Sequence, residues 1–219
     1  MKIEPFTKTY QERTVLQFPG GEFLPGTVYA VLGPNGSGKS TFASVISGVL
    51  ASDRGTPVLE KIKTGYLPQH PYAFHMSLKK NILLNGEGSS DEKKERAQML
   101  MDSLSLSSLS SKNAASLSGG ETAKMSLARL LMKKYSLLIL DEPCAAMDLR
   151  SIRQAEALIR DYVKETNCVL FIITHSFRQA ERLADETLIF IDGCLVERGA
   201  TGQVLGNAHN AQVREFLEF

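Results

Sequence analysis

The sequence lacks several features that would each indicate a particular class of protein. No apolar run approaches the ~20 residues that cross a bilayer, and the N-terminus, MKIEPFTKTY, has no signal-peptide stretch. The three cysteines, Cys144, Cys168 and Cys194, are an odd number at wide spacing, which suits neither a disulfide framework nor a zinc site. The net charge is only +1, too weak a field to gather nucleic acid. These absences predict a cytosolic protein with free thiols.

The composition is that of one folded unit. With 219 residues, of which 43% are hydrophobic and 22% charged, the chain can bury a sizeable core. TVYAVLG at 27–33 is a short apolar run that ends in glycine, which predicts a buried parallel strand. The spacing of Phe42, Val45, Ile46 and Val49 predicts a helix packed on the sheet.

The second half of the chain repeats this alternation. LLIL at 137–140 and VLFIIT at 169–174 are continuous apolar runs that suit central strands covered on both faces. The dipeptide Asp192-Gly193 lies between TLIFI and CLVER and favours a type I′ turn, so a hairpin is predicted at one edge. The core is therefore predicted to be α/β.

Residues 70–134 show no such strands and are predicted to be a helical insertion. Ser89, followed three residues later by Glu92, has the spacing of a helix-capping box. The serine-rich stretch 103–120 would be a flexible linker by composition alone, but it leads into a glycine-rich turn, LSGGE. The expected division of the single domain 1–219 is an α/β core at 1–69 and 135–219 and a helical subdomain at 70–134.

A phosphate-binding loop is predicted at residues 33–40. GPNGSGKS matches G-x-x-x-x-G-K-[ST] and lies between a predicted strand and a predicted helix, whereas a glycine-rich turn with a chance lysine is the alternative. Glycines let backbone N–H groups converge on phosphates, Lys39 can reach the β- and γ-phosphates, and the Ser40 hydroxyl can bind Mg²⁺. The predicted nucleotide-binding residues of this loop are Gly33, Asn35, Gly36, Ser37, Gly38, Lys39, Ser40 and Thr41.

Acidic residues follow another predicted strand. LLILDEP brings Asp141 and then Glu142 to the carboxyl end of the strand, where open α/β sheets bind ligands. Asp141 suits a metal shell and Glu142 an attacking water, although the pair would be a solvated acidic loop in the alternative interpretation. Adjacent residues of a strand point to opposite faces of the sheet. Asp141 and Glu142 could therefore both ligate one metal in the same manner only if the strand ends at Asp141. His175 ends FIITH and could touch the γ-phosphate or the water, or could be structural.

These motifs, in this order, resemble the ATPase subunit of an ATP-binding cassette (ABC) transporter over essentially the whole chain. YLPQ would end in the metal-contacting Gln69, LSGGE would be the signature, AAMD the D-loop with Asp148, and ITH the switch histidine. The resemblance implies a P-loop NTPase core with a mostly parallel sheet, a reduced antiparallel β subdomain and an inserted helical subdomain. It implies ATP and Mg²⁺ as cofactors, with Mg²⁺ bound by Ser40, Gln69 and Asp141.

The resemblance also implies a second copy of the chain, or a paralogous ATPase subunit, packed head to tail. Ser118, Gly119 and Gly120 of one subunit would then contact the γ-phosphate that the other holds. ETAKMSLARLL is a plausible helix whose N-terminus would face that anion. Tyr10 is implied to stack on the adenine, with Phe6 as the rival and a core position as the third possibility.

The sequence departs from the usual family pattern in three places. The D-loop reads Ala145-Ala146-Met147-Asp148, where serine first and leucine before the aspartate are more common. At the position of Lys124, members of the family more often have a neutral pair of residues or a pair that contains arginine. Only 30 positions separate Lys39 from Gln69, so the antiparallel sheet usually built there is expected to be trimmed.

The implied reaction is in-line attack of water on the γ-phosphoryl group, driven by positioning and electrostatics. Glu142 would orient or deprotonate the water, while Lys39, His175 and Ser118 in trans share the charge. The implied role is to power transport by integral membrane subunits, from the cytoplasmic face of the membrane. The ending TGQVLGNAHNAQVREFLEF resembles the tails of importer ATPases for small polar solutes or oxyanions, which would add a solute-binding protein as a partner.

Two interpretations of the segment after Gln69 stay open. In HPYAFHMSLKKNILL, Tyr72, Phe74, Met76 and Leu78 either belong to the core of the insertion or form an exposed patch for a membrane subunit. A soluble ABC-type ATPase acting on nucleic acid or ribosomes would need a coiled coil, a second cassette or a basic face, and the sequence offers none. A nucleotide kinase or a binding-only protein is opposed by LSGGE and Glu142. No nucleic-acid partner is expected.

Overall fold

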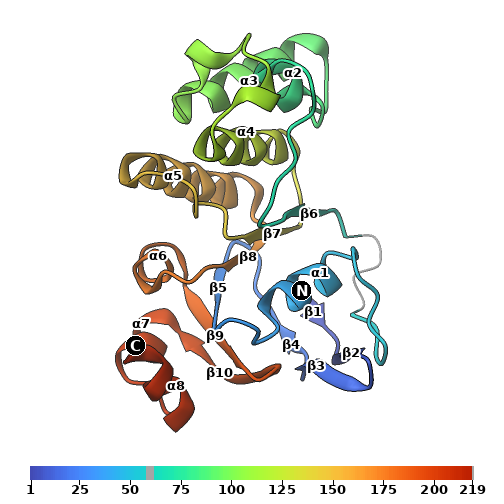
Figure 1. The fold of residues 1–219 in the computed structure, drawn as a ribbon, viewed down its shortest axis with the longest axis vertical. Coiled ribbons are helices and arrows are strands. Elements are labelled where there is room, and N and C mark those ends of the chain that lie inside the picture. Colours follow the sequence, from blue (N-terminus) through green and yellow to red (C-terminus); the bar gives the residue numbers. More distant parts are fainter. Residues whose placement is uncertain (58–61, 219) are drawn as a thin grey trace. The chain divides into compact units, whose positions relative to one another are not determined.

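The fold is that of a computed structural model, which describes residues 1–57 and 62–218 (Figure 1). Internal contacts divide the chain into two compact units. The first comprises Met1–Tyr66, Tyr135–Asp141 and Asn167–Phe219, and the second comprises Leu67–Lys134 and Glu142–Thr166. No helix among the described residues is both long and apolar enough to cross a membrane.

The first unit is built on a mixed sheet of eight strands, ordered β2-β3-β10-β9-β5-β8-β7-β6. The neighbours β9, β5, β8 and β7 all pair in parallel, whereas β2–β3 and β9–β10 are antiparallel. A separate antiparallel pair joins β1 (Lys2–Ile3) to β4 (Gly21–Glu22). The prediction of an α/β fold with a mostly parallel sheet is confirmed. The strands of the large sheet are β2 (Phe6–Tyr10), β3 (Arg13–Phe18), β5 (Val28–Leu32), β6 (Thr64–Leu67), β7 (Leu137–Asp141), β8 (Val169–Ile173), β9 (Glu186–Ile191) and β10 (Cys194–Ala200).

Every residue of β5, β7 and β8 is buried, as their continuous apolar runs predict for central strands. Helix α1 (Lys39–Ile46) packs its apolar face on the sheet, where the Phe42 ring lies among aromatic side chains of β2, β3, β8 and β9. Within the described residues this unit also contains three shorter helices: α6 (Phe177–Leu183), α7 (Thr201–Gly206) and α8 (Ala211–Leu217).

The predicted helical stripe is wrong at one position, because Val49 is 71% exposed and lies beyond α1. The helix ends at Ile46, and Gly48 then adopts the left-handed conformation, φ 78°, that commonly follows a helix C-terminus. Between α1 and β6 the described residues, 47–57 and 62–63, form no strand. This agrees with the shortened segment that the spacing from Lys39 to Gln69 predicts.

The predicted hairpin is confirmed, since β9 and β10 are antiparallel and joined at Asp192-Gly193. Both residues have positive φ, 47° and 79°, as a type I′ turn requires. A Cβ atom on Gly193 would lie 2.6 Å from the carbonyl oxygen of Val15, so the turn also needs glycine for space.

The second unit is helical apart from its connecting segments, and its helices α2, α3 and α4 lie side by side (Figure 1). The predicted capping box is present at the start of α3: Glu92 N donates to Ser89 Oγ (3.3 Å), and Ser89 N donates to Glu92 Oε2 (2.7 Å). The serine-rich stretch contains two 3₁₀ turns, Ser107–Leu109 and Ala114–Ser116. The helices of this unit are α2 (Leu78–Leu83), α3 (Ser90–Ser103), α4 (Gly119–Leu131) and α5 (Leu149–Thr166).

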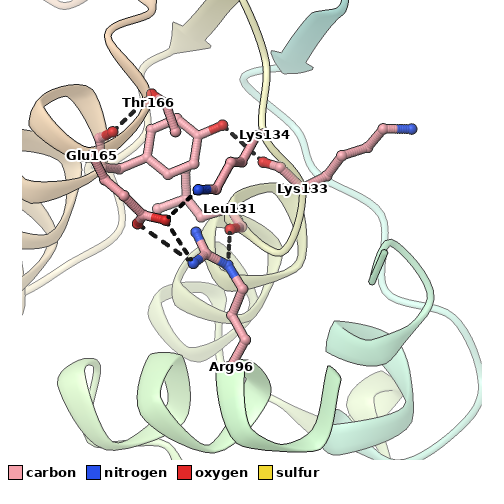
Figure 2. A network of polar contacts seen from close by, with 7 residues as sticks. Arg96, Leu131, Lys133, Lys134, Glu165 and Thr166 are labelled. Carbon is pink, nitrogen blue, oxygen red and sulfur yellow. Dashed lines mark hydrogen bonds and ion pairs between the residues drawn. The ribbon is translucent and has the colours of Figure 1, made fainter. Parts of the chain in front are cut away.

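A polar network fixes the C-terminal end of α4 to two other helices of the second unit (Figure 2). Arg96 on α3 donates to the Leu131 carbonyl (3.0 Å) and to Glu165 on α5 (3.3 Å). Lys134 pairs with the same carboxylate at 3.1 Å, and the Tyr162 hydroxyl donates to the Lys133 carbonyl (2.8 Å). Partial burial opposes ionisation of Glu165, but the hydrogen bonds and positive charges of Lys134 and Arg96 together outweigh it, so the pKa of Glu165 is lowered.

We expect Phe42→Ala to lower the free energy of unfolding by about 3–5 kcal/mol, because it removes a fully buried ring and leaves a cavity between α1 and the sheet. Urea unfolding followed by circular dichroism measures the change. Leu24→Ala is the control, since Leu24 is 62% exposed and should cost no more than about 0.5 kcal/mol. Equal effects of the two substitutions would contradict this description of the core.

Candidate nucleotide site

The glycine loop joins the end of β5 to the start of α1, as the motif predicts, and its glycines differ in their surroundings. A Cβ atom on Gly33 would lie 2.0 Å from the Phe190 carbonyl oxygen, and one on Gly38 would lie 3.0 Å from that of Val15. Around Gly36, by contrast, nothing lies within 4 Å. Gly33 and Gly38 are therefore required by packing, while Gly36, with φ 78°, presents its backbone to an open face.

Lys39 lies at the centre of the loop. It is buried, and its ammonium group donates to the carbonyl oxygens of Gly33 and Pro34, each at 2.8 Å. The Ser37 hydroxyl is also buried, and within the described residues it has no hydrogen-bond partner. A buried cation and an unsatisfied hydroxyl on one loop are the groups that an incoming phosphate would satisfy.

The N-terminus of α1 supports the same interpretation. Its N-cap residue, Gly38, offers no side-chain acceptor, and no acidic residue lies in the first turn. The first N–H groups of the helix and its partial positive charge are therefore left for an external anion. Asn35 and Ser40 are exposed at this loop and Thr41 is partly exposed, so all three are accessible. The donor set fits the phosphates of a nucleotide.

Asp141 and His175 belong to the same unit as Lys39. His175 interacts electrostatically with both Lys39 and Asp141. Asp141 is the buried last residue of β7, and His175 follows β8. Partial burial, and then the charge of Lys39, lower the pKa of His175, while Asp141 opposes the shift. The imidazole is therefore neutral at pH 7. The Tyr66 hydroxyl has a pKa raised by burial and also by Asp141, so the acid has a phenol nearby.

The structure separates the two aromatic candidates for adenine. Phe6 is 2% exposed and packs on Phe18 and Phe42, so it belongs to the core. Tyr10 is 49% exposed at the end of β2, with the Lys8 ammonium 5.3 Å from its ring centroid. Among the possibilities that the sequence left open, the core position applies to Phe6 and not to Tyr10.

The remaining predicted site residues belong to the second unit. β7 ends at Asp141, and Glu142 has φ 50°, a left-handed conformation that is uncommon for a residue other than glycine and is often found at functional sites. The two acids therefore do not alternate along one strand. Gln69 is exposed just beyond β6. Asp148 accepts from Ser151 N (2.8 Å) at the start of α5; this bond, more than the charge of Lys124, lowers its pKa.

The signature residues begin α4. Ser118 is its N-cap, and Gly119 and Gly120 are its first two residues. A Cβ atom on Gly120 would lie 2.7 Å from the Ala146 carbonyl oxygen, so glycine lets the signature turn approach the D-loop. Around Gly119 the nearest atom is 3.6 Å away, which leaves its backbone accessible.

Sequence reasoning missed a residue here, Glu121. Its N–H donates to Ser118 Oγ (3.2 Å), and its carboxylate accepts from Ser118 N (2.7 Å). This is a second capping box, and the spacing Ser-x-x-Glu that revealed the one at Ser89 is equally visible at Ser118.

Comparison with known proteins agrees with this geometry. The family described as ABC transporter matches residues 20–145, more than half of the chain. The chain belongs to the ABC transporter family. It is 35% identical to a molybdate/tungstate import ATP-binding protein of Archaeoglobus fulgidus, over 90% of this chain and 87% of that protein. It is 34% identical to a tungstate uptake system ATP-binding protein of Peptoclostridium acidaminophilum, over 93% and 97%.

A solved structure of an ATP-binding subunit of an ABC transporter has the same fold, with a TM-score of 0.86 at 20% identity, covering 100% of this chain and 99% of that one. The inserted helices and the small antiparallel pair are therefore features of an ABC ATPase. The chain binds and hydrolyses ATP as a member of this family.

We expect Lys39→Ala to weaken ATP binding by at least about tenfold, because it removes the only side-chain charge that the loop itself carries. Isothermal titration calorimetry with ATP measures the affinity. Lys2→Ala is the control, since Lys2 is a surface lysine of the same unit that pairs with Glu4. Unchanged affinity in Lys39→Ala would contradict the assignment of the phosphate loop.

Proposed function

We propose that this ABC ATPase powers the uptake of a small oxyanion by an integral membrane transporter. The observation that carries the proposal is similarity along nearly the whole chain to ATP-binding proteins named for molybdate and tungstate import. The ATPase would be peripheral, on the cytoplasmic face of the membrane. A solute-binding protein would deliver the oxyanion to the transporter.

We propose the following residues as contacts with the nucleotide and its metal ion. Tyr10 stacks on the adenine, and residues 33–41 bind the phosphates. Ser40, Gln69 and Asp141 would hold Mg²⁺. The described residues contain no group of three or more His, Cys, Asp or Glu side chains that could hold a metal ion. When bound, Mg²⁺ neutralises charge on the β- and γ-phosphates.

The proposed catalytic residues act on water and on the γ-phosphoryl charge. Glu142 accepts a proton from the attacking water or orients it, and its left-handed backbone takes it out of the alternation of the strand that ends at Asp141. The neutral imidazole of His175 donates a hydrogen bond to the γ-phosphate. The Lys39 ammonium moves from the loop carbonyls to the phosphate oxygens, which keep it satisfied.

We propose that Ser118, Gly119 and Gly120 serve a nucleotide bound by a second copy of the chain or by a paralogous subunit. The capping box supports this, because the Ser118 oxygen already accepts from Glu121 N and its own O–H remains a donor. Gly119 adds an accessible N–H at the start of a helix of 13 residues. Asp148 contacts the other subunit beside this turn.

An exposed aromatic pair is the proposed docking surface for the membrane subunit. Tyr72 and Phe74 are 62% and 43% exposed, and their ring centroids are 5.1 Å apart. Arg129 on α4 holds the pair, since it donates to the Tyr72 carbonyl (2.7 Å) and lies 5.2 Å from the Phe74 ring. Leu78 is fully buried in α2, so of the two possibilities that the sequence leaves open it takes the core position. Fixed, exposed aromatic rings suit a protein interface.

We further propose that residues 1–69 and 135–219 act as the nucleotide-binding core and residues 70–134 as the helical subdomain. The alternative function is a soluble ABC-type ATPase that is not coupled to transport. Affinity purification of the tagged chain from its own membranes distinguishes the two. An integral membrane transporter recovered with the wild type but lost with Phe74→Ala supports transport coupling, and recovery of no membrane protein supports the alternative.

Glu142→Gln should slow ATP turnover by about 10²–10⁴-fold while ATP binding is retained, because the amide keeps the shape of the side chain but cannot accept the proton. Steady-state phosphate release and calorimetry measure the two quantities. Glu181→Gln, an exposed carboxylate on α6, is the control and should hydrolyse ATP normally. Normal turnover in Glu142→Gln would remove the proposed role of this residue.

If the signature acts across subunits, specific ATPase activity should rise with protein concentration until dimers dominate. Ser118→Arg should abolish turnover and leave ATP binding by the monomer nearly intact, because the bulky cation blocks the turn that meets the partner's phosphates. Ser89→Arg is the matched control, since Ser89 is the capping-box serine of α3 in the same unit. A specific activity that is independent of concentration and survives Ser118→Arg would show that one chain hydrolyses ATP alone.

A further inference from the structure

The signature turn carries a negative charge of its own. The Glu121 carboxylate lies in the first turn of α4 and accepts from Ser118 N, and this bond is the main reason why its pKa is lowered. Glu121 is therefore ionised at neutral pH. Its charge stabilises the helix, but it also lies three residues from the serine proposed to receive a phosphate.

One lysine contacts this carboxylate. Lys112 Nζ lies 3.4 Å from Glu121 Oε2, and both side chains are partly buried, at 38% and 27% exposure. Lys124, the other lysine near the turn, interacts with Asp148. Among the described residues, Lys112 is thus the cation that contacts the carboxylate of the capping box.

The backbone of Lys112 is held in place by the segment that follows the aromatic pair. The Lys112 carbonyl accepts from Leu78 N (2.9 Å), and Lys79 N donates to the Ser110 carbonyl (3.0 Å). Ala114 N donates to the Met76 carbonyl (2.9 Å). Leu78 is fully buried at the start of α2, so the approach of Lys112 to Glu121 is set by packed structure rather than by a mobile tail.

We propose that Lys112 is a positioning residue for the reaction: it neutralises Glu121 so that the signature turn can receive the γ-phosphate bound by a second copy of this chain. The inference rests on the proposed function of Ser118 in trans. An unpaired carboxylate beside a phosphate would oppose association, because like charges brought together across an interface are strongly unfavourable. Loss of Lys112 therefore weakens the ATP-bound dimer and leaves the nucleotide affinity of the monomer unchanged.

The test measures ATP-dependent dimerisation by sedimentation velocity, with Mg²⁺ and ATP, in the full chain carrying Glu142→Gln to slow hydrolysis. Lys112→Met should raise the dimer dissociation constant by at least about tenfold, whereas Lys112→Arg should change it little. Glu121→Gln in the Lys112→Met background should restore dimerisation, since glutamine also completes a capping box but carries no charge.

Lys94→Met is the matched control. Lys94 pairs at 3.0 Å with Asp91 in the first turn of α3, so the variant removes an equivalent surface pair from the same unit without touching the signature. It should dimerise like the parent. A partly exposed ion pair contributes little to stability, so Lys112→Met should leave the melting temperature almost unchanged. A lower melting temperature that Glu121→Gln does not reverse would instead indicate a merely structural role for Lys112.

The possible failures are distinguishable. A parent that stays monomeric with ATP at every concentration contradicts the trans arrangement of the proposed function, and with it this inference. A parent that dimerises, with a Lys112→Met variant that dimerises equally well or is not restored by Glu121→Gln, contradicts the role of Lys112 alone.

Discussion

The first unit depends on a lysine whose charge is buried inside its own loop. Lys39 is 6% exposed, and a buried ammonium group is tolerated only where acceptors surround it, here the carbonyls of Gly33 and Pro34. Gly33 directly follows a central strand, β5, and it lies so close to Phe190 that a Cβ atom there would be 2.0 Å from the Phe190 carbonyl oxygen. The strand, the loop and α1 are thus joined by close packing and by the hydrogen bonds of Lys39, which place a positive charge where an anion can bind.

The two glycine-rich turns start their helices in opposite ways. At α1 no side chain caps the first N–H groups and no acid lies in the first turn, so the helix can bind an anion without competition. At α4 the chain supplies its own acid, Glu121, which already occupies Ser118 N. This capping box already supplies the N-terminus of α4 with one negative charge, and the proposed role of Lys112 is to balance that charge when the turn receives a second anion.

Local patterns predicted much of this because they depend on neighbours in the sequence. Continuous apolar runs identified β5, β7 and β8, the Asp192-Gly193 turn identified the β9–β10 hairpin, and Ser-x-x-Glu at Ser89 identified the start of α3. The helical spacing of α1, however, was wrong about where the helix ends. Val49 continues the spacing of α1 but lies past a glycine that ends the helix, and a helical period carries no information about where the helix stops.

The sequence by itself determined which residues form the phosphate loop, where the acids follow a strand, and which family the chain resembles, since each of these depends on residues close together in the chain. Only the tertiary structure decided which aromatic is accessible, because burial of Phe6 and exposure of Tyr10 depend on partners from β3 and α1. It also decided that Arg129 holds Tyr72 and Phe74, and that Lys112 meets Glu121. These contacts join residues that no local period relates, and packing in three dimensions alone brings them within reach.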